Sequence, residues 1–212
     1  MSAWALRLSR EELAPAAVRA LPPGPRVLYA RDGTAAVSHD GGEQALAADS
    51  AWHGAGGASI RAGDRGAVLL CWELTSRATA PRGALLLEHA IDLDPTTAWL
   101  MRCDRVDFEP GGVALPHRHR GGGIRCLLTG ALEVTVGDAP PRAVRPGGAW
   151  FESGREPVLA RAAQEATSFV RVSILPAEIR GRSSILYVDP TDASRGKPRR
   201  YTVWVDEPIA LP

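Results

Sequence analysis

The sequence is poor in the residues that cross-link a protein or give it a strong charge. Only three of its 212 residues are cysteines, an odd number at wide spacing that predicts neither a disulfide framework nor a zinc knuckle. Its 25 basic and 24 acidic side chains nearly cancel and leave a formal net charge of +1. This balance gives no electrostatic basis for binding a nucleic acid or an anionic membrane, so we expect neither as a partner.

Long apolar runs and two common enzyme motifs are also lacking. No run approaches the roughly 20 apolar residues that span a bilayer, and the first residues, MSAWALRLSREELAP, become charged before the apolar region of a signal peptide has formed. We therefore expect a cytoplasmic protein. The chain contains no Gly-x-Ser-x-Gly elbow, and its triple glycine at 121–123 does not stand between a strand and a helix as a phosphate-binding loop does.

What the chain does contain is a succession of short apolar segments separated by turn residues. The segments are rich in β-branched and aromatic residues, and the 22 glycines and 17 prolines suit many tight turns. This spacing predicts an all-β sandwich or barrel. Ahead of these segments, Ser9 and Glu12 match a capping box, which predicts a short helix over residues 10–20.

Two stretches of the chain, residues 33–52 and 130–150, resemble one another. Each begins with a glycine that opens a short alternating strand, and each ends with an Ala-Trp pair. An apolar strand then follows in both copies, AVLLCWEL in the first and SFVRVSIL in the second. We interpret the two stretches as copies of one β unit, the alternative being chance similarity between glycine-rich β sequences.

The most informative segment holds two histidines, His117 and His119, two residues apart. On an extended strand both side chains project from the same face and can bind one metal ion. The surrounding residues resemble the first sequence motif of the cupin family, because Gly111, His117, His119 and Gly130 stand at the spacing of that motif.

A second segment extends the resemblance. The residues RPGGAWF at 145–151 are similar to the Pro-Gly turn that opens the second cupin motif, so the resemblance covers residues 98–175. It implies a cupin-type double-stranded β-helix, or jelly-roll, barrel and a bicupin-like chain. The parts expected are a helical arm (1–20), a degenerate cupin-like half (21–95), a cupin barrel (96–178) and a C-terminal strand extension (179–212).

The chain departs from the cupin pattern at two ligand positions. Gly123 stands where the motif has a glutamate, and Val158 stands where the third histidine falls. The resemblance implies a divalent metal ion, Fe, Mn, Ni or Zn, at the histidine pair, and that ion would need a further ligand. Glu152 is the first candidate for this ligand or for a catalytic acid or base, and Glu156 is the second. The alternative is that both glutamates are solvated loop residues.

Arg125 and Trp150 are candidates for binding a substrate. If Gly123 faces the barrel interior, strand alternation points Arg125 inward as well. A guanidinium beside a cation site attracts a carboxylate or phosphate, and an aromatic side chain such as Trp150 commonly lines a ligand pocket. The alternatives are that Arg125 pairs with an internal carboxylate and that Trp150 belongs to the core.

Two functions of different classes follow from these residues. In the first, the protein is a metal-dependent enzyme of the dioxygenase, isomerase or lyase type that acts on a small carboxylate-bearing molecule, with Arg125 holding the anion and Glu152 assisting catalysis. In the second, it is a non-catalytic ligand-binding or structural cupin that has lost its catalytic metal. The C-terminal strand at 201–205 would cover a barrel edge or pair across a subunit interface, and we expect a homodimer.

Overall fold

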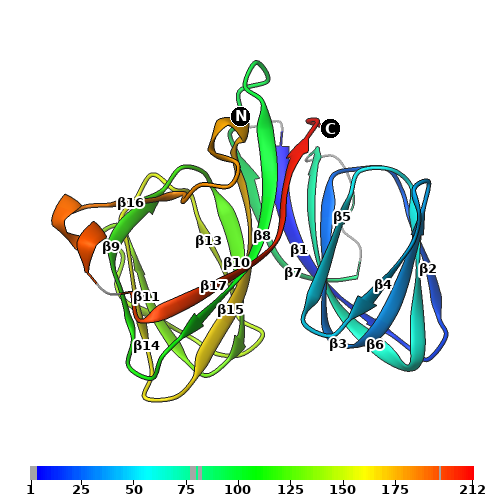
Figure 1. The fold of residues 1–212 in the computed structure, drawn as a ribbon, viewed down its shortest axis with the longest axis horizontal. Coiled ribbons are helices and arrows are strands. Elements are labelled where there is room, and N and C mark those ends of the chain that lie inside the picture. Colours follow the sequence, from blue (N-terminus) through cyan, green and yellow to red (C-terminus); the bar gives the residue numbers. More distant parts are fainter. Residues whose placement is uncertain (1–3, 77–79, 81–82, 196) are drawn as a thin grey trace. The chain divides into compact units, whose positions relative to one another are not determined.

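The computed structural model describes residues 4–76, 80, 83–195 and 197–212. Within them the chain forms 17 β-strands, β1 to β17, and two 3-10 helices of three and five residues (Figure 1). The prediction of an all-β protein is therefore confirmed. None of the helices in this described part is long and apolar enough to cross a membrane.

The chain divides into two compact units. The first comprises Met1–Met101 and Glu207–Pro212, and the second comprises Arg102–Asp206. The chain leaves the first unit within β8 (Trp99–Phe108) and returns to it within β17 (Arg199–Ile209). Each unit has an apolar core of its own.

The first unit is built on a single sheet of seven strands. Its order is β4-β3-β6-β1-β7, with β2 paired to β6 and β5 paired to β3, and neighbouring strands run antiparallel. Its core includes Leu28, Trp52 and Cys71. The strands are β1 (Trp4–Leu13), β2 (Val18–Leu21), β3 (Arg26–His39), β4 (Gly42–Ala47), β5 (Ser50–Gly54), β6 (Ala58–Ser76) and β7 (Ala84–Ile91).

The short N-terminal helix predicted over residues 10–20 is wrong. Strand β1 continues through Leu13 and pairs with β6 along its whole length of 10 residues. A turn at Ala16, whose φ is 57°, then leads into β2. Ser9 and Glu12 match a capping pattern worth about 1 kcal/mol, but the long ladder and the burial of the leucines of β1 outweigh that local preference.

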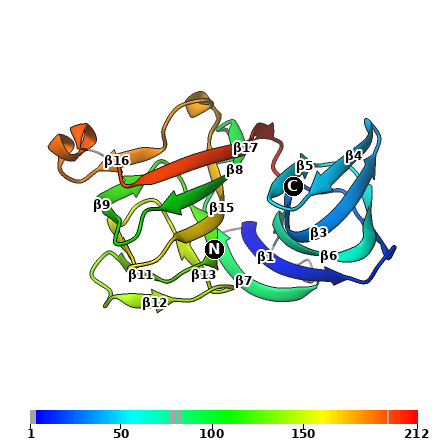
Figure 2. The ribbon, with the colours of Figure 1, turned by 60° about the horizontal axis from the view of Figure 1, so that its bottom comes forward.

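The second unit consists of two five-stranded sheets that face one another across its interior (Figures 1 and 2). One sheet has the order β13-β10-β15-β8-β17 and the other β12-β11-β14-β9-β16. This is the jelly-roll arrangement predicted for the barrel. Its remaining strands are β9 (Val113–His119), β10 (Gly123–Thr129), β11 (Leu132–Val136), β12 (Arg142–Val144), β13 (Ala149–Glu152), β14 (Val158–Ala162), β15 (Thr167–Pro176) and β16 (Ile185–Tyr187).

Both units contain the same three-strand pairing. In the first unit β3 lies between β5 and β6, and in the second β10 lies between β13 and β15. Gly33 and Gly130 open the matched turns with φ of +70° and +73°, and a Cβ at either would lie within 2.7 Å of a backbone oxygen. The residues opposite one another in register are Leu28, Trp52 and Cys71 in the first unit and Arg125, Trp150 and Arg171 in the second.

Candidate functional site

The two histidines of β9 lie on one face of the strand and point into the barrel. Both side chains are buried, and their rings meet edge to face with centroids 4.9 Å apart. The Nδ1 of His117 is 2.7 Å from the carbonyl of Leu115, so Nδ1 carries the proton and donates it there. The Nε2 of His117 is then the unprotonated nitrogen. His119 Nδ1 lies 3.4 Å from the Oγ of Ser184.

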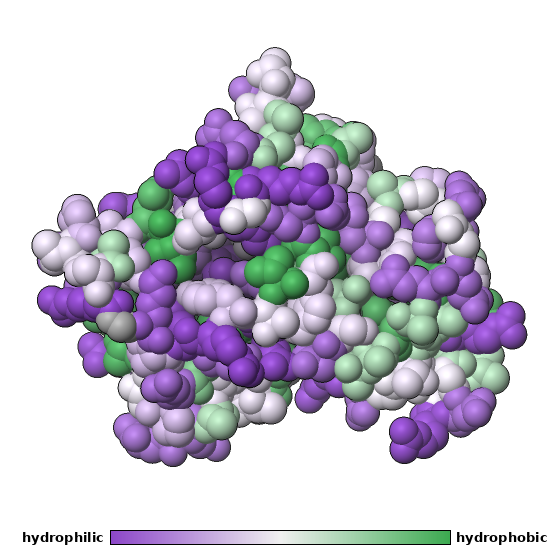
Figure 3. All heavy atoms as spheres, viewed as in Figure 1, coloured by the Kyte–Doolittle hydropathy of each residue, from purple (hydrophilic) through white to green (hydrophobic). Residues whose placement is uncertain are grey.

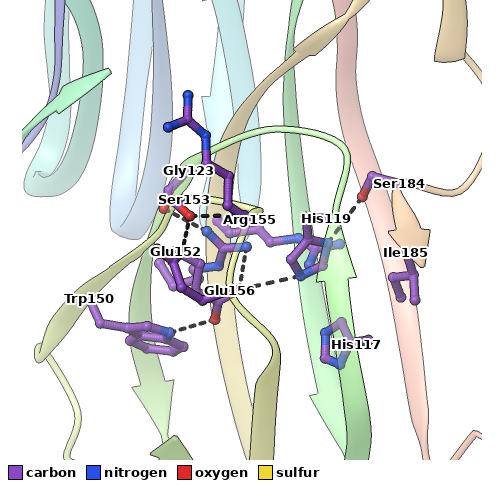
Figure 4. A network of polar contacts seen from close by, with 12 residues as sticks. His117, His119, Gly123, Trp150, Glu152, Ser153, Arg155, Glu156, Ser184 and Ile185 are labelled. Atoms are coloured by element: carbon purple, nitrogen blue, oxygen red, sulfur yellow. Dashed lines mark hydrogen bonds and ion pairs between the residues drawn. The ribbon is translucent and has the colours of Figure 1, made fainter. Parts of the chain in front are cut away.

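Glu152 enters the same interior from the end of β13, directly opposite Gly123 on β10. Its Oε1 accepts a hydrogen bond of 2.8 Å from the indole of Trp150, and its Oε2 lies 2.6 Å from Nη2 of Arg125. The same Oε2 is 3.3 Å from Nε2 of His119 (Figure 4). Glu152 is therefore a buried member of the site and not a solvated loop residue.

Glu156, the second candidate, does not reach this cluster. Its side chain is exposed and accepts a hydrogen bond from the hydroxyl of Ser153 in the turn before β14.

Burial and pairing together set the charges of the cluster. Burial opposes ionisation of Glu152, but the adjacent Arg125 and the hydrogen bond from His119 hold its pKa below the usual range. Burial lowers the pKa of His119 to about 3, with Glu152 opposing the shift, and burial also lowers the pKa of His117. At neutral pH the cluster therefore holds two neutral imidazoles and one carboxylate.

A second buried ion pair lies beside the first. Arg125 and Arg171 are opposite one another on β10 and β15, and both guanidinium groups are buried. The Nε and Nη2 of Arg171 bind the two carboxylate oxygens of Asp104, on β8, at 2.6 and 2.9 Å. Burial opposes the charge of Arg171, yet this bidentate pair raises its pKa; burial lowers the pKa of Arg125 to about 10.

The side chains of the cluster enclose a cavity of about 20 Å³. This volume accommodates about one water molecule. The wall of this cavity includes the five residues proposed from the sequence for the site, together with three other polar residues that were not predicted. The predicted residues are His117, His119, Arg125, Trp150 and Glu152, and the others are Arg171, Arg199 and Tyr201.

Arg199 differs from the other two arginines of this cavity because no carboxylate in the described part of the chain pairs with it. The side chain is buried, its Nε donates to the hydroxyl of Tyr201 at 2.6 Å, and Nη2 lies 3.4 Å from the hydroxyl of Tyr187. Its guanidinium also stacks over the rings of Phe108 and Tyr201, about 6 Å from each centroid. The one sequence signal that points to Arg199 is its position at the start of β17, a strand that contains aromatic residues.

The donor set does not complete a site for a resident divalent metal. Among the described residues no group of three or more histidine, cysteine, aspartate or glutamate side chains is placed to hold one. The histidines offer two nitrogen donors, but the oxygens of Glu152 are engaged by Trp150, Arg125 and His119. A metal at His117, His119 and Glu152 therefore stays a prediction.

The position of Arg125 agrees with the strand alternation. It faces the interior, and an internal carboxylate, that of Glu152, lies against it. Chemically the cluster provides a proton acceptor at the Nε2 of His117 and a fixed negative charge at Glu152, beside a cavity with room for about one water molecule.

Comparison with known proteins gives matches to solved structures alone. No family model and no curated protein matches the sequence. The structure is similar to a formate complex of oxalate decarboxylase from Lactobacillus farciminis, with a TM-score of 0.66 and 15% identity over 91% of this chain and 82% of that chain. It is also similar to AerE from Microcystis aeruginosa, with a TM-score of 0.62 and 12% identity over 82% and 88% of the two chains.

A third similar structure is a cupin 2 conserved barrel domain protein from Leptotrichia buccalis, with a TM-score of 0.52 and 16% identity over 80% of this chain and 83% of that chain. Identities this low establish the fold and leave the activity open. The resemblance found in the sequence is thus confirmed at the level of the fold, and the chain is a protein of the cupin fold.

Proposed function

We propose that the second unit binds a small carboxylate-bearing molecule whose reacting end meets His117, His119 and Glu152. The observation that carries this proposal is the difference between matched positions of the two units. Where the first unit has Leu28 and Cys71 in an apolar core, the second has two buried arginines. The same three-strand pairing therefore forms without any charge at these positions, so the fold does not require them.

The charges of the second unit favour an anion over a cation. Three buried arginines face the interior, and two carboxylates, Glu152 and Asp104, compensate two of them. The histidines are neutral, so one positive charge, that of Arg199, is left over. A buried cation without a counter-ion is costly, and a ligand carboxylate would offset it through a charge-assisted hydrogen bond.

In this proposal Arg125 acts through Glu152. Its guanidinium keeps the carboxylate ionised and fixed in place, while Arg199 is the residue available to the ligand. We further infer that the first unit is a degenerate cupin half, because it shares the strand pairing and has an apolar core where the second unit has its site.

Calorimetric titration with short-chain carboxylates and with their neutral amides tests the proposal. We expect the carboxylates to bind and the amides not to, and we expect Arg199→Met to weaken carboxylate binding about tenfold or more. Arg200→Met is the matched control, because Arg200 is the next residue along the chain and is exposed. A wild-type protein that binds no carboxylate would contradict the proposal.

A metal-dependent enzyme that uses Fe, Mn, Ni or Zn is a second candidate. The observation in its favour is that His117 donates its Nδ1 proton to a backbone carbonyl, the orientation that most metal-binding histidines share. Elemental analysis of protein purified without added metal decides between the two. Stoichiometric metal that disappears in His117→Ala favours the metal enzyme, and metal-free protein that binds carboxylates favours the first proposal.

A further inference from the structure

A larger pocket lies beside the histidine cavity within the second unit. Its volume is about 380 Å³, within the range of about 300 to 1,000 Å³ typical of small-molecule sites. Residues 181–185, which precede and begin β16, line it together with residues of β8, β15 and β17. The surface over this unit is hollowed, and hydrophilic side chains and a hydrophobic group border the hollow (Figure 3). We call this the outer pocket.

The outer pocket carries two positive charges that no acid of its wall compensates. Its acids are Asp104 and Asp206, and each already binds a buried arginine with both oxygens, Asp104 holding Arg171 and Asp206 holding Arg102. The remaining cations of the wall are Arg182 and Lys197.

Neither of these two cations has a carboxylate partner in the described part of the chain. Arg182 donates to the carbonyl of Glu178, and the ammonium of Lys197 lies 5.9 Å from the ring centroid of Tyr187. Both side chains are exposed at the pocket, where they can meet a ligand.

The outer pocket and the histidine cavity share parts of their walls. Arg171 and Tyr201 line both. Ser184 lines the outer pocket, and its hydroxyl is the group that lies 3.4 Å from Nδ1 of His119. Because the inner cavity has room for about one water, the body of a ligand that approaches the histidines has to lie in the outer pocket.

The remaining wall includes apolar side chains beside two serines. Ile185 and Val203 contribute aliphatic surface, and Tyr201 contributes an aromatic ring. Such a wall suits a carbon chain or ring between two charged groups better than an inorganic ion, which offers no apolar surface to bury.

We propose that the outer pocket binds an organic dianion of metabolite size, with one acid group against Arg182 and Lys197 and its carbon body against Ile185 and Val203. The inference rests on the proposed function, because it assigns the second acid group to Arg199 at the histidine cavity. It adds the class of ligand, a molecule with two separated acid groups, and the residues that select it.

Calorimetric titration with straight-chain dicarboxylates from succinate to pimelate, beside monocarboxylates of the same lengths, tests the inference. We expect the wild-type protein to prefer a dicarboxylate. Lys197→Met and Arg182→Met should each weaken dicarboxylate binding about tenfold and leave monocarboxylate binding unchanged. Arg195→Met is the control, since Arg195 is exposed, pairs with Asp192 and lies outside the pocket.

The outcomes separate this inference from the proposed function. If monocarboxylates and dicarboxylates bind equally, or if both variants bind dicarboxylates as the wild type does, the dianion site is refuted while the carboxylate function stands. If no carboxylate binds at all, the proposed function fails and the dianion site fails with it. Circular dichroism of each variant establishes that a lost affinity is not lost folding.

Discussion

Arg125 and Glu152 form a buried ion pair beside the two histidines of the second unit. Both groups are inside the barrel, and their atoms Nη2 and Oε2 are 2.6 Å apart. An ion pair in this setting contributes little net stability, because desolvating two charges offsets most of their attraction. Removing one partner alone, however, leaves the other charge buried without compensation.

A double-mutant cycle tests this description of the pair. We expect Arg125→Met and Glu152→Met to lower the free energy of unfolding by about 3–5 kcal/mol each. The double variant should lose clearly less than the sum of the two, although Trp150 and His119 still lose their acceptor. Urea denaturation at neutral pH gives the three values. Additive losses in the double variant would mean that the two groups are not energetically coupled.

The depressed pKa of His119 predicts how stability depends on pH. The unfolded chain protonates this histidine near pH 6.5, whereas the folded chain does so at about 3. Between these values the unfolded state binds the additional proton, so the free energy of unfolding falls as pH falls, by about 1.4 kcal/mol per pH unit. Glu152, also depressed, adds its loss only below the unfolded pKa of about 4.3.

Urea denaturation at pH 7 and pH 5 measures this slope. His119→Gln keeps a donor for Glu152 but does not titrate. Between pH 7 and pH 5, its free energy of unfolding should therefore fall by about 2 kcal/mol less than that of the wild type. The exposed His89 provides the control variant, His89→Gln, which should show the wild-type slope. Equal slopes in all three proteins would show that His119 is not held neutral.

Among the elements, the register of the strands accounts for the glycine at position 123 of β10. A Cβ at Gly123 would lie 2.4 Å from the carbonyl oxygen of Val172, so β10 has no room for a side chain at this position. The carboxylate comes instead from Glu152, the residue opposite on β13. Val158 on β14 lies opposite His117 and faces the same cavity.

This register predicts that Val158→His creates a zinc site. The new imidazole would stand beside His117 and supply the third nitrogen donor that the barrel lacks. We expect the variant to bind Zn²⁺ at least about tenfold more tightly than the wild type in competition with a chelator. Leu159→His is the matched control, because the neighbouring position on β14 faces the other side of the strand. Equal binding by both variants would refute the placement of Val158.

The sequence was sufficient to predict the all-β class and the shared face of the two histidines on β9, because both depend on the pattern of residues close together in the chain. It was not sufficient for the region around Ser9, where the local capping pattern predicts a helix but pairing with β6 forms a strand. Arg171 was missed because an arginine inside an apolar run does not reveal its partner. Asp104 lies 67 residues away, and only the folded barrel brings the two together.

In the whole molecule, one β arrangement occurs twice with different side chains in its interior. The first unit fills the matched positions with Leu28, Trp52 and Cys71 and buries a purely apolar core there. In the second unit, apolar residues such as Leu127 and Phe169 belong to the same core as Trp150. The positions that match Leu28 and Cys71 hold the buried charges of Arg125 and Arg171. The barrel can hold these charges because its other interior positions still provide an apolar core.

The C-terminal strands bear on the oligomeric state. Strand β17 covers β8 within the same chain, and β16 and β17 are each the last strand of their sheets. Three of the five large apolar side chains that are exposed in the described residues lie here, Leu186, Val188 and Val203. Exposed edge strands with apolar side chains are surfaces that pair with another chain.

We therefore expect a homodimer that forms through the edge at β16. Light scattering at micromolar concentration should give twice the mass of the chain, and Leu186→Lys should halve it, since a lysine on an edge strand opposes pairing. Val18→Lys is the control, because Val18 is an exposed apolar residue of the first unit, far along the chain from β16. A monomeric wild type would refute the dimer, and a dimer that resists Leu186→Lys but not Val18→Lys would move the interface to the first unit.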